Sequence, residues 1–169
     1  NLSKQLNKIQ HVSNLYNIEE QTKLSEWLTE NSCAEAAFFC NSGAEANEAA
    51  IKLIRKYGSK INNNKESIIL AAESSFHGRT FAALSATGQP KYHHGFEPLL
   101  SGFKFFKYND FESVKNIFKE CEKSNQTIAG ILIEPIQGEG GVIPGNKKFF
   151  KQLRQICDQK NSLLIFDEV

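Results

Sequence analysis

The chain has 169 residues, which is enough for one sizeable domain. It is 40% hydrophobic and 23% charged, the balance of an ordinary globular protein. Its net charge is only +1, so nucleic acid and anionic membrane surfaces are not favoured as partners. The sequence also lacks an apolar run that could cross a bilayer and an N-terminal secretory segment. We therefore expect a cytoplasmic protein that binds neither nucleic acid nor membrane.

The four cysteines have no Cys-x-x-Cys spacing, so their pattern does not favour a metal site. Three of them occupy apolar positions in their segments: Cys40, Cys121 and Cys157. This placement predicts buried, reduced thiols, as in the cytoplasm.

Residues 41–48 are predicted to join an apolar strand at 36–40 to a helix. Ser42 and Glu45 have the spacing of a capping box at the start of that helix. A single apolar face is then predicted from Ala46, Ala49, Ala50, Leu53, Ile54 and Tyr57. Gly58 is predicted to end the helix as a left-handed cap. The free N–H groups of the first turn favour an anion site, although the same pattern also fits a helix start without a ligand.

The remaining apolar runs predict strands that alternate with amphipathic helices. Strands are expected at 67–72, 103–106, 128–133 and 163–166, and helices at 3–10, 18–31 and 81–86, after Asn109 or Asp110, and after Asn146. A second capping box, Asn17 with Glu20, is expected to start the helix at 18–31. The alternation favours an α/β fold with a mostly parallel sheet covered by helices on both faces. Residues 1–35 are expected to form a helical segment that leads into a domain at 36–169.

Polar residues follow four of the predicted strands, after positions 40, 72, 133 and 166. In open parallel sheets, ligands bind at the carboxyl ends of strands, so these segments are expected to converge. Asp167 could hold Mg²⁺ as in a phosphate-loop nucleotidase, pair with a pyridinium nitrogen, or cap a neighbouring element. No Gly-Lys-Ser or Gly-Lys-Thr triplet is present, which disfavours the nucleotidase.

Four segments together resemble the class III pyridoxal-phosphate aminotransferases, and they occur in that family's order. They are residues 39–47 (FCNSGAEAN), 76–80 (FHGRT), 134–141 (EPIQGEGG) and 166–169 (FDEV). Members that act on N-acetylornithine are most similar at residues 11–16, 85–92 and 95–99. The resemblance implies part of the large domain of a fold-type I enzyme that uses pyridoxal 5'-phosphate. It implies amino transfer between N-acetylornithine and 2-oxoglutarate in arginine biosynthesis.

Three other functions stay open. The amino donor could be ornithine or 4-aminobutyrate. The chain could belong to a non-catalytic relative that kept the phosphate site, or it could be a generic phosphate-binding α/β module.

The resemblance implies a role in cofactor binding for seven residues. The cofactor phosphate would be held at the helix start by Ser42, Gly43 and Ala44. Phe76 and Val169 would pack on the two faces of the ring, and Asp167 would pair with its nitrogen. Glu168 belongs to the same cofactor segment.

Two further residues are implied on the substrate side. Arg79 would form a bidentate pair with the substrate α-carboxylate, the alternative being a structural ion pair at the surface. Glu139 would lie near the substrate pocket, while Glu134 is expected to have a structural hydrogen-bonding role. Three histidines show no metal-ligand pattern and are interpreted as local hydrogen-bonding or surface residues: His77, His93 and His94.

Parts that the resemblance requires are absent from the sequence. The family's catalytic lysine, which bonds the cofactor, would lie on a strand beyond Val169, and the threonine supplied across the dimer interface is also missing. The chain contains no methionine, and its final run at 163–169 stops at the carboxyl end of a predicted strand. We therefore expect a fragment truncated at both ends and inactive alone, from a homodimer that uses amino acid and 2-oxo acid substrates.

Overall fold

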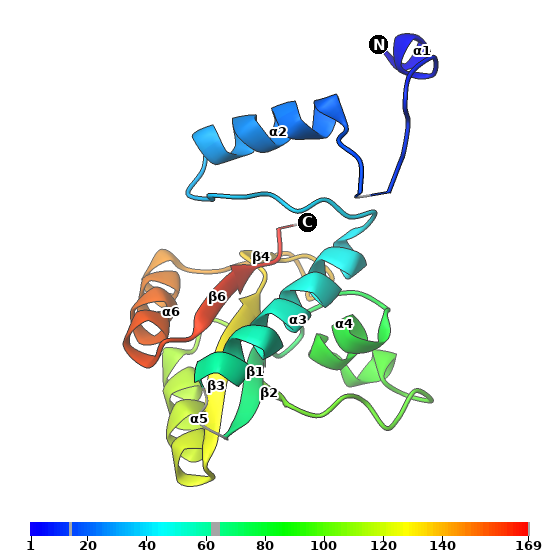
Figure 1. Cartoon of the computed structure of the whole chain (residues 1–169). Helices are drawn as coiled ribbons and strands as arrows, with labels where there is room; N and C mark the ends of the chain where they lie inside the picture. Colours follow the sequence, from blue (N-terminus) through cyan, green and yellow to red (C-terminus); the bar gives the residue numbers. More distant parts are fainter. Residues whose placement is uncertain (14, 62–64, 169) are drawn as a thin grey trace. The chain divides into compact units, whose positions relative to one another are not determined.

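The computed structural model describes residues 1–13, 15–61 and 65–168, and it divides into two compact units, Asn1–Cys40 and Asn41–Val169. The first unit contains helices α1 (Leu2–Gln5) and α2 (Glu19–Glu30), shown in Figure 1. The helix predicted at 18–31 is confirmed, whereas the one predicted at 3–10 is shorter. Among the described residues, no helix is long and apolar enough to cross a membrane.

The start of α2 differs from the prediction. Its N-cap residue is Ile18, and no side chain caps its first turn. The capping box of Asn17 and Glu20 is therefore wrong, because the helix begins one residue later than that box requires.

The second unit is built on a four-stranded sheet whose strands are all parallel. The strand order is β2 (Phe103–Phe106), β1 (Glu66–Ala72), β3 (Gln126–Ile133) and β6 (Leu163–Phe166). The two central strands, β1 and β3, are almost wholly buried. The predicted strands and the parallel sheet are thereby confirmed.

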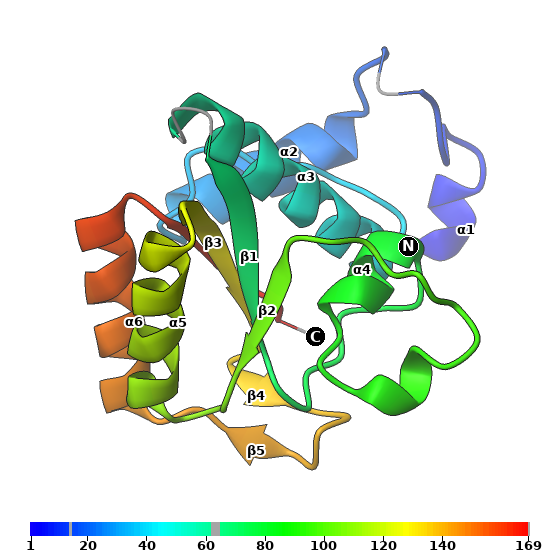
Figure 2. The ribbon, with the colours of Figure 1, turned by 90° about the horizontal axis from the view of Figure 1, so that it is seen from below.

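Helices cover both faces of the sheet, as Figure 2 shows. On one face lie α5 (Phe111–Lys123) and α6 (Lys147–Lys160), which pack on alternate strand residues such as Leu70 and Ile131. On the other face lie α3 (Gly43–Ile61) and α4 (Phe81–Ala86), which pack on Ile69 and Leu132. The alternation of side chains along each strand divides the core into these two layers.

Polar side chains fix the starts of α5 and α6, as the sequence predicts. The Asp110 carboxylate accepts hydrogen bonds from the N–H groups of Glu112 and Ser113. The Asn146 amide oxygen accepts one from the N–H of Phe149, at 2.7 Å. Each cap satisfies donors that the helix itself cannot pair.

The apolar run at 36–40 is not a strand, so that prediction is wrong. A strand requires a partner for its backbone groups, and no described segment pairs with this one. Phe38 is 69% exposed, and Cys40 is also exposed, contrary to its predicted burial. Cys121 and Cys157 are buried, as predicted.

The buried face of α3 matches the predicted one only in part, because Ile54 is buried as predicted but Ala46 and Leu53 are exposed. Its buried residues are Asn47, Ile51, Ile54 and Gly58, whereas Leu53 of the predicted face is 58% exposed. Gly58 lies inside the helix, which continues to Ile61, so its predicted role as a cap is wrong. A Cβ added at Gly58 would lie 2.5 Å from Ser67 Oγ and 2.8 Å from Ala129 Cβ, so glycine lets the helix approach the sheet closely.

Two small elements were not predicted. A two-stranded antiparallel hairpin is formed by β4 (Ile136–Gln137) and β5 (Ile143–Pro144), and η1 (Pro90–Tyr92) is a short 3₁₀ helix. The hairpin follows β3, so it lies at the carboxyl end of the sheet, as Figure 2 shows.

Candidate active site

A cavity of about 310 Å³ lies where three segments of the second unit meet. These segments are the start of α3, the turn that follows β1, and the residue that follows β6. The lining residues are Gly43, Ala44, Asn47, Phe76, His77, Gly78, Arg79 and Asp167. Polar segments predicted after positions 72 and 166 therefore converge with the helix start, as expected for a parallel sheet.

Two residues of the first turn of α3, Gly43 and Ala44, line this cavity. The N–H of Glu45 donates to Ser42 Oγ at 3.2 Å, while Glu45 Oε2 accepts from the N–H of Asn41 at 2.7 Å. The first-turn N–H groups of Gly43 and Ala44 have no acceptor within the helix. A Cβ added at Gly43 would meet nothing within 4 Å, so this residue borders open space. A helix start of this kind favours an anionic ligand.

The turn after β1 packs closely on the same helix start. Gly78 has φ +131°, a backbone conformation that L side chains rarely adopt. A Cβ at this position would lie 2.9 Å from Ala44 Cβ and 3.1 Å from Ala83 Cβ. Gly78 therefore allows the segment of Phe76 and Arg79 to reach the cavity.

Asp167 is fixed by donors from two other segments. Its Oδ2 lies 2.9 Å from Nδ2 of Asn47 and 2.8 Å from Nδ1 of His77. Its backbone N–H donates to the carbonyl oxygen of Ile133 at 2.9 Å. Two side-chain donors on one oxygen fix the orientation of the carboxylate. The side chain remains 12% exposed and lines the cavity.

Phe76 and Arg79 lie together on the turn after β1. The guanidinium carbon of Arg79 is 5.8 Å from the ring centroid of Phe76, and the ring of Tyr92 meets Phe76 edge-on at 5.4 Å. Arg79 is exposed and forms no ion pair within the described residues. A structural ion pair, the alternative considered from the sequence, is therefore not formed in this part of the protein.

Glu134 forms a hydrogen bond with the turn that follows β1. Its Oε2 accepts a hydrogen bond from the N–H of Phe76 at 3.2 Å. Burial raises the pKa of the Glu134 carboxyl, and the nearby Asp167 carboxylate adds to the rise. The Tyr108 hydroxyl donates to the carbonyl oxygens of Glu134 and Pro135, and burial raises the pKa of Tyr108 to about 12.

Asp167 also lines a second cavity, of about 410 Å³. It is lined by Pro135, Ile136, Asp167 and Glu168. Glu139 is exposed in the turn between β4 and β5 and lines neither cavity, and Val169 lies outside the described residues.

Sequence reasoning missed the two residues that hold Asp167. His77 was interpreted as a local or surface residue, but it is buried and contacts a residue 90 positions away. Asn47 lies in the buried stripe of α3, and a polar residue in such a stripe signals a required hydrogen-bond partner. Asn47 was not recognised from the sequence as a buried polar residue, because the predicted apolar face of α3 did not include it.

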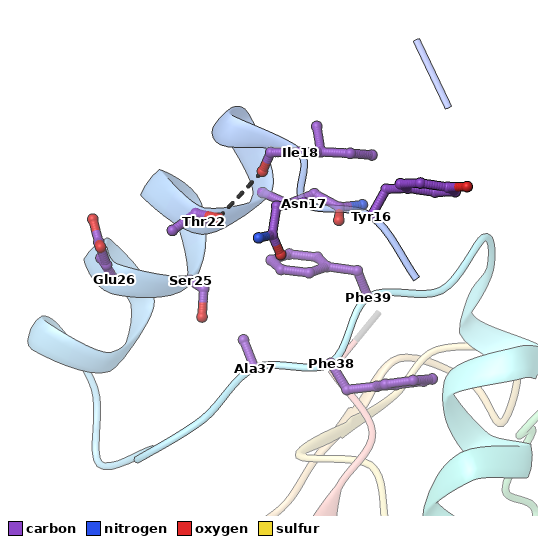
Figure 3. Close-up of a pocket in the computed structure, with 10 residues that line it drawn as sticks. Tyr16, Asn17, Ile18, Thr22, Ser25, Glu26, Ala37, Phe38 and Phe39 are labelled. Carbon is purple, nitrogen blue, oxygen red and sulfur yellow. Dashed lines mark hydrogen bonds between the residues drawn. The ribbon is translucent and has the colours of Figure 1, made fainter. Parts of the chain in front are cut away.

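The first unit has a hollow of its own, of about 410 Å³. Figure 3 shows it between α2 and the segment that carries Ala37, Phe38 and Phe39. None of the site residues expected from the sequence lines this hollow.

Sequence comparisons place these features among known proteins. The family model described as "Aminotransferase class-III" matches residues 1–169. Acetylornithine aminotransferase from Prochlorococcus marinus subsp. pastoris is 71% identical over 168 residues. That match covers 99% of this chain and 40% of the relative, so the chain spans about 40% of the relative's length.

Solved structures show the same fold. The ornithine aminotransferase from Toxoplasma gondii, in a structure with partial occupancy of PLP at its active site, has a TM-score of 0.85 and 27% identity. The match covers 98% of this chain and 38% of that one. The N-acetylornithine aminotransferase from Stenotrophomonas maltophilia has a TM-score of 0.73 and 33% identity, with the same coverage.

Proposed function

This chain belongs to the class III aminotransferase family, and on that premise we propose that the protein transfers an amino group between N-acetylornithine and 2-oxoglutarate. Its sheet, covered by helices on both faces, is that of the large domain of fold-type I pyridoxal-phosphate-dependent transferases. The names of the similar acetylornithine aminotransferases support this amino donor and a place in arginine biosynthesis. Ornithine and 4-aminobutyrate are the competing donors.

The proposed cofactor is pyridoxal 5'-phosphate, and the residues of the 310 Å³ cavity fit it. Open space at Gly43, in the first turn of α3, suits a phosphate group. Phe76 offers an aromatic face, and Asp167 offers a carboxylate held by two donors. When bound, this cofactor supplies a protonated ring that withdraws electrons from the substrate.

Each residue then has a distinct task. The N–H groups of Gly43 and Ala44, with the Ser42 hydroxyl, bind the phosphate. The Asp167 carboxylate holds a proton at the ring nitrogen, and Phe76 packs on the ring. Glu168 and Val169 are assigned to the same cofactor segment.

The substrate tasks fall to residues at the edge of the cavity. Arg79 binds the substrate α-carboxylate through its forked guanidinium, which matches a carboxylate in shape. Glu139 is assigned to the edge of the substrate pocket. No lysine lines the cavity among the described residues, so the role of the family's catalytic lysine is assigned to none of its lining residues.

We further propose that the protein is a homodimer, with residues 1–35 leading into the cofactor-binding domain. The exposed face of α3, which carries Ala46 and Leu53, supports an interface. Analytical ultracentrifugation of the full-length protein tests it, and a monomer at micromolar concentration would reject this assembly.

The convergence of the α3 start, Phe76 and Asp167 on one cavity is the observation that carries the proposal. To test it, full-length protein is mixed with pyridoxal phosphate and the visible absorption band of bound cofactor is recorded. Glutamate formation is then measured with N-acetylornithine, ornithine and 4-aminobutyrate as donors. We expect the highest kcat/KM with N-acetylornithine.

The variant Asp167→Asn removes the charge at the ring nitrogen. It is expected to lower kcat by about 100-fold or more, the scale of a lost catalytic proton contact. Asp158→Asn is the matched control, because Asp158 is an exposed residue of α6 that pairs with Arg154 and lines neither cavity. Absence of the absorption band would favour a generic phosphate-binding module, and equal kcat/KM values would reject N-acetylornithine as the preferred donor.

A further inference from the structure

Asn47 joins three parts of the site through one amide group. Its Nδ2 donates to the backbone oxygen of His77 at 2.7 Å and to Oδ2 of Asp167 at 2.9 Å. Because the amide nitrogen carries two protons, both are used. The residue is only 5% exposed, and it lies one helical turn after Gly43.

This arrangement determines which oxygen of Asp167 is available. Oδ2 takes donors from Asn47 and His77, whereas Oδ1 accepts no hydrogen bond from the described residues. Asp167 also borders both cavities at the carboxyl end of the sheet. The two donors therefore hold one oxygen on the protein side and leave the other for a ligand.

We propose that Asn47 is a positioning residue, which ties Asp167 to helix α3 and so sets the separation between the phosphate-binding turn and the carboxylate that meets the ring nitrogen. This inference rests on the proposed function. A rigid helix joins Gly43 to Asn47, so one element carries the anchor for the phosphate and the anchor for Asp167. Both ends of a bound cofactor are thereby held at a fixed spacing.

The other buried residues of α3 are apolar or glycine. Asn47 shares its buried stripe with Ile51 and Ile54, and the leucine side chain has the same number of heavy atoms as that of asparagine, branched at the same carbon. A buried amide is disfavoured unless its donors are paired. We therefore attribute the asparagine at position 47 to its two hydrogen bonds and not to packing in the core.

His77 contributes from the opposite side. Its ring is buried, and Nδ1 lies 2.8 Å from Oδ2 of Asp167. The backbone N–H of His77 donates to Thr87 Oγ1 at 3.0 Å. Its Nε2 is buried without a partner in the described residues. When Nδ1 donates its proton to Asp167, Nε2 is left as an unpaired acceptor. Asn47 thus orients His77 through its backbone oxygen as well as holding Asp167 directly.

The test uses full-length holoenzyme and the variants Asn47→Leu and Asn47→Asp. The first removes both donors, and the second places a carboxylate against Oδ2 of Asp167 at nearly constant volume. We expect each to lower kcat and raise the cofactor dissociation constant by about tenfold or more, the scale of one lost charge-assisted hydrogen bond. The KM of the amino donor is expected to change little, and the absorption band of bound cofactor is expected to shift.

Asn116→Leu and Asn116→Asp are the matched controls, since Asn116 is exposed on α5, and they are expected to behave as wild type. A purely structural role for Asn47 would lower the thermal midpoint without changing the absorption band or the kcat of folded protein, and that result would overturn the inference. Loss of folding in both Asn47 variants would overturn it as well. If wild-type protein binds no pyridoxal phosphate, the proposed function itself fails, which is a distinct outcome.

Discussion

The backbone N–H of Phe76 donates a hydrogen bond to Oε2 of Glu134 across 3.2 Å. Glu134 follows β3 and is only 3% exposed, while Phe76 lies in the turn after the neighbouring strand β1. A buried carboxyl therefore fixes the backbone of the residue whose ring lines the cavity. The protonation state of Glu134 is consequently linked to the stability of this part of the site.

We predict that Glu134→Gln flattens the dependence of stability on pH. Burial raises the pKa of Glu134 above its ordinary value of 4.5, so the folded protein binds this proton more tightly than the unfolded chain. The contribution to the free energy of unfolding is full below pH 4.5 and is lost as pH rises through the higher folded pKa. Glutamine keeps an acceptor for Phe76 but does not titrate.

Thermal midpoints of cofactor-free protein, measured from below pH 4.5 to neutral pH, test this prediction. Wild type is expected to lose more stability than Glu134→Gln over that range. Glu73→Gln is the control, because Glu73 is exposed just after β1. Parallel curves for wild type and Glu134→Gln would show that Glu134 does not control the dependence.

A second prediction concerns Gly78. Gly78→Ala strains a backbone at φ +131° and brings the new Cβ to 2.9 Å from Ala44 Cβ, so the turn must move away from the start of α3. We expect the dissociation constant of pyridoxal phosphate to rise by about tenfold, equivalent to about 1.4 kcal/mol. Cofactor titration of the full-length variant measures it.

Gly95→Ala separates strain from contact. Gly95 also has a positive φ, +86°, but a Cβ there would meet nothing within 4 Å. This variant is expected to lose about 1 kcal/mol of stability and to keep its cofactor affinity. If both alanine variants bind the cofactor equally well, the close approach at Gly78 does not shape the site.

Local sequence signals predicted most of the second unit. Strands β1 and β3 are mostly continuous apolar runs in the sequence. Helices α5 and α6 are each preceded by a capping residue, Asp110 and Asn146. Such signals depend only on residues that are close in the sequence, so they can be recognised before the fold is known. Three of the four motifs, at 39–47, 76–80 and 166–169, likewise contain the residues that line the cavity.

Features that depend on distant packing were not predictable in the same way. Two overlapping faces of α3 fit the helical period and both include Ile54, so only the position of the sheet selects the face of Ile51 over that of Leu53. The bond between Asn47 and Asp167 joins residues 120 positions apart. The run at 36–40 has strand composition, but composition cannot supply the neighbouring strand that its backbone requires.

A third prediction concerns the start of α5. Asp110→Ala removes the acceptor for the N–H groups of Glu112 and Ser113 and is expected to cost about 1 kcal/mol of stability. Asp110→Asn keeps an oxygen acceptor, so it should cost only a few tenths of that amount. Denaturant unfolding followed by circular dichroism measures both. Equal losses for the two variants would mean that charge, rather than capping, stabilises this helix start.

The last prediction addresses the substrate side of the site. Arg79 is exposed at the cavity, its guanidinium carbon is 5.8 Å from the Phe76 centroid, and within the described residues no carboxylate neutralises it. Arg79→Ala is therefore expected to raise the KM of the amino donor by about 10-fold to 100-fold, the range for a lost bidentate ion pair. The dissociation constant of the cofactor should change little, because no cofactor contact is assigned to this side chain.

Two further variants make the test specific to the forked guanidinium. Arg79→Lys keeps the charge but not the paired donors, so its KM should fall between wild type and Arg79→Ala. Lys91→Ala is the matched control, since Lys91 is also an exposed cation over an aromatic ring, 4.8 Å from the centroid of Tyr92. Its KM is expected to equal that of wild type. Steady-state kinetics with varied amino donor decide the matter, and an unchanged KM in Arg79→Ala would remove Arg79 from the substrate site.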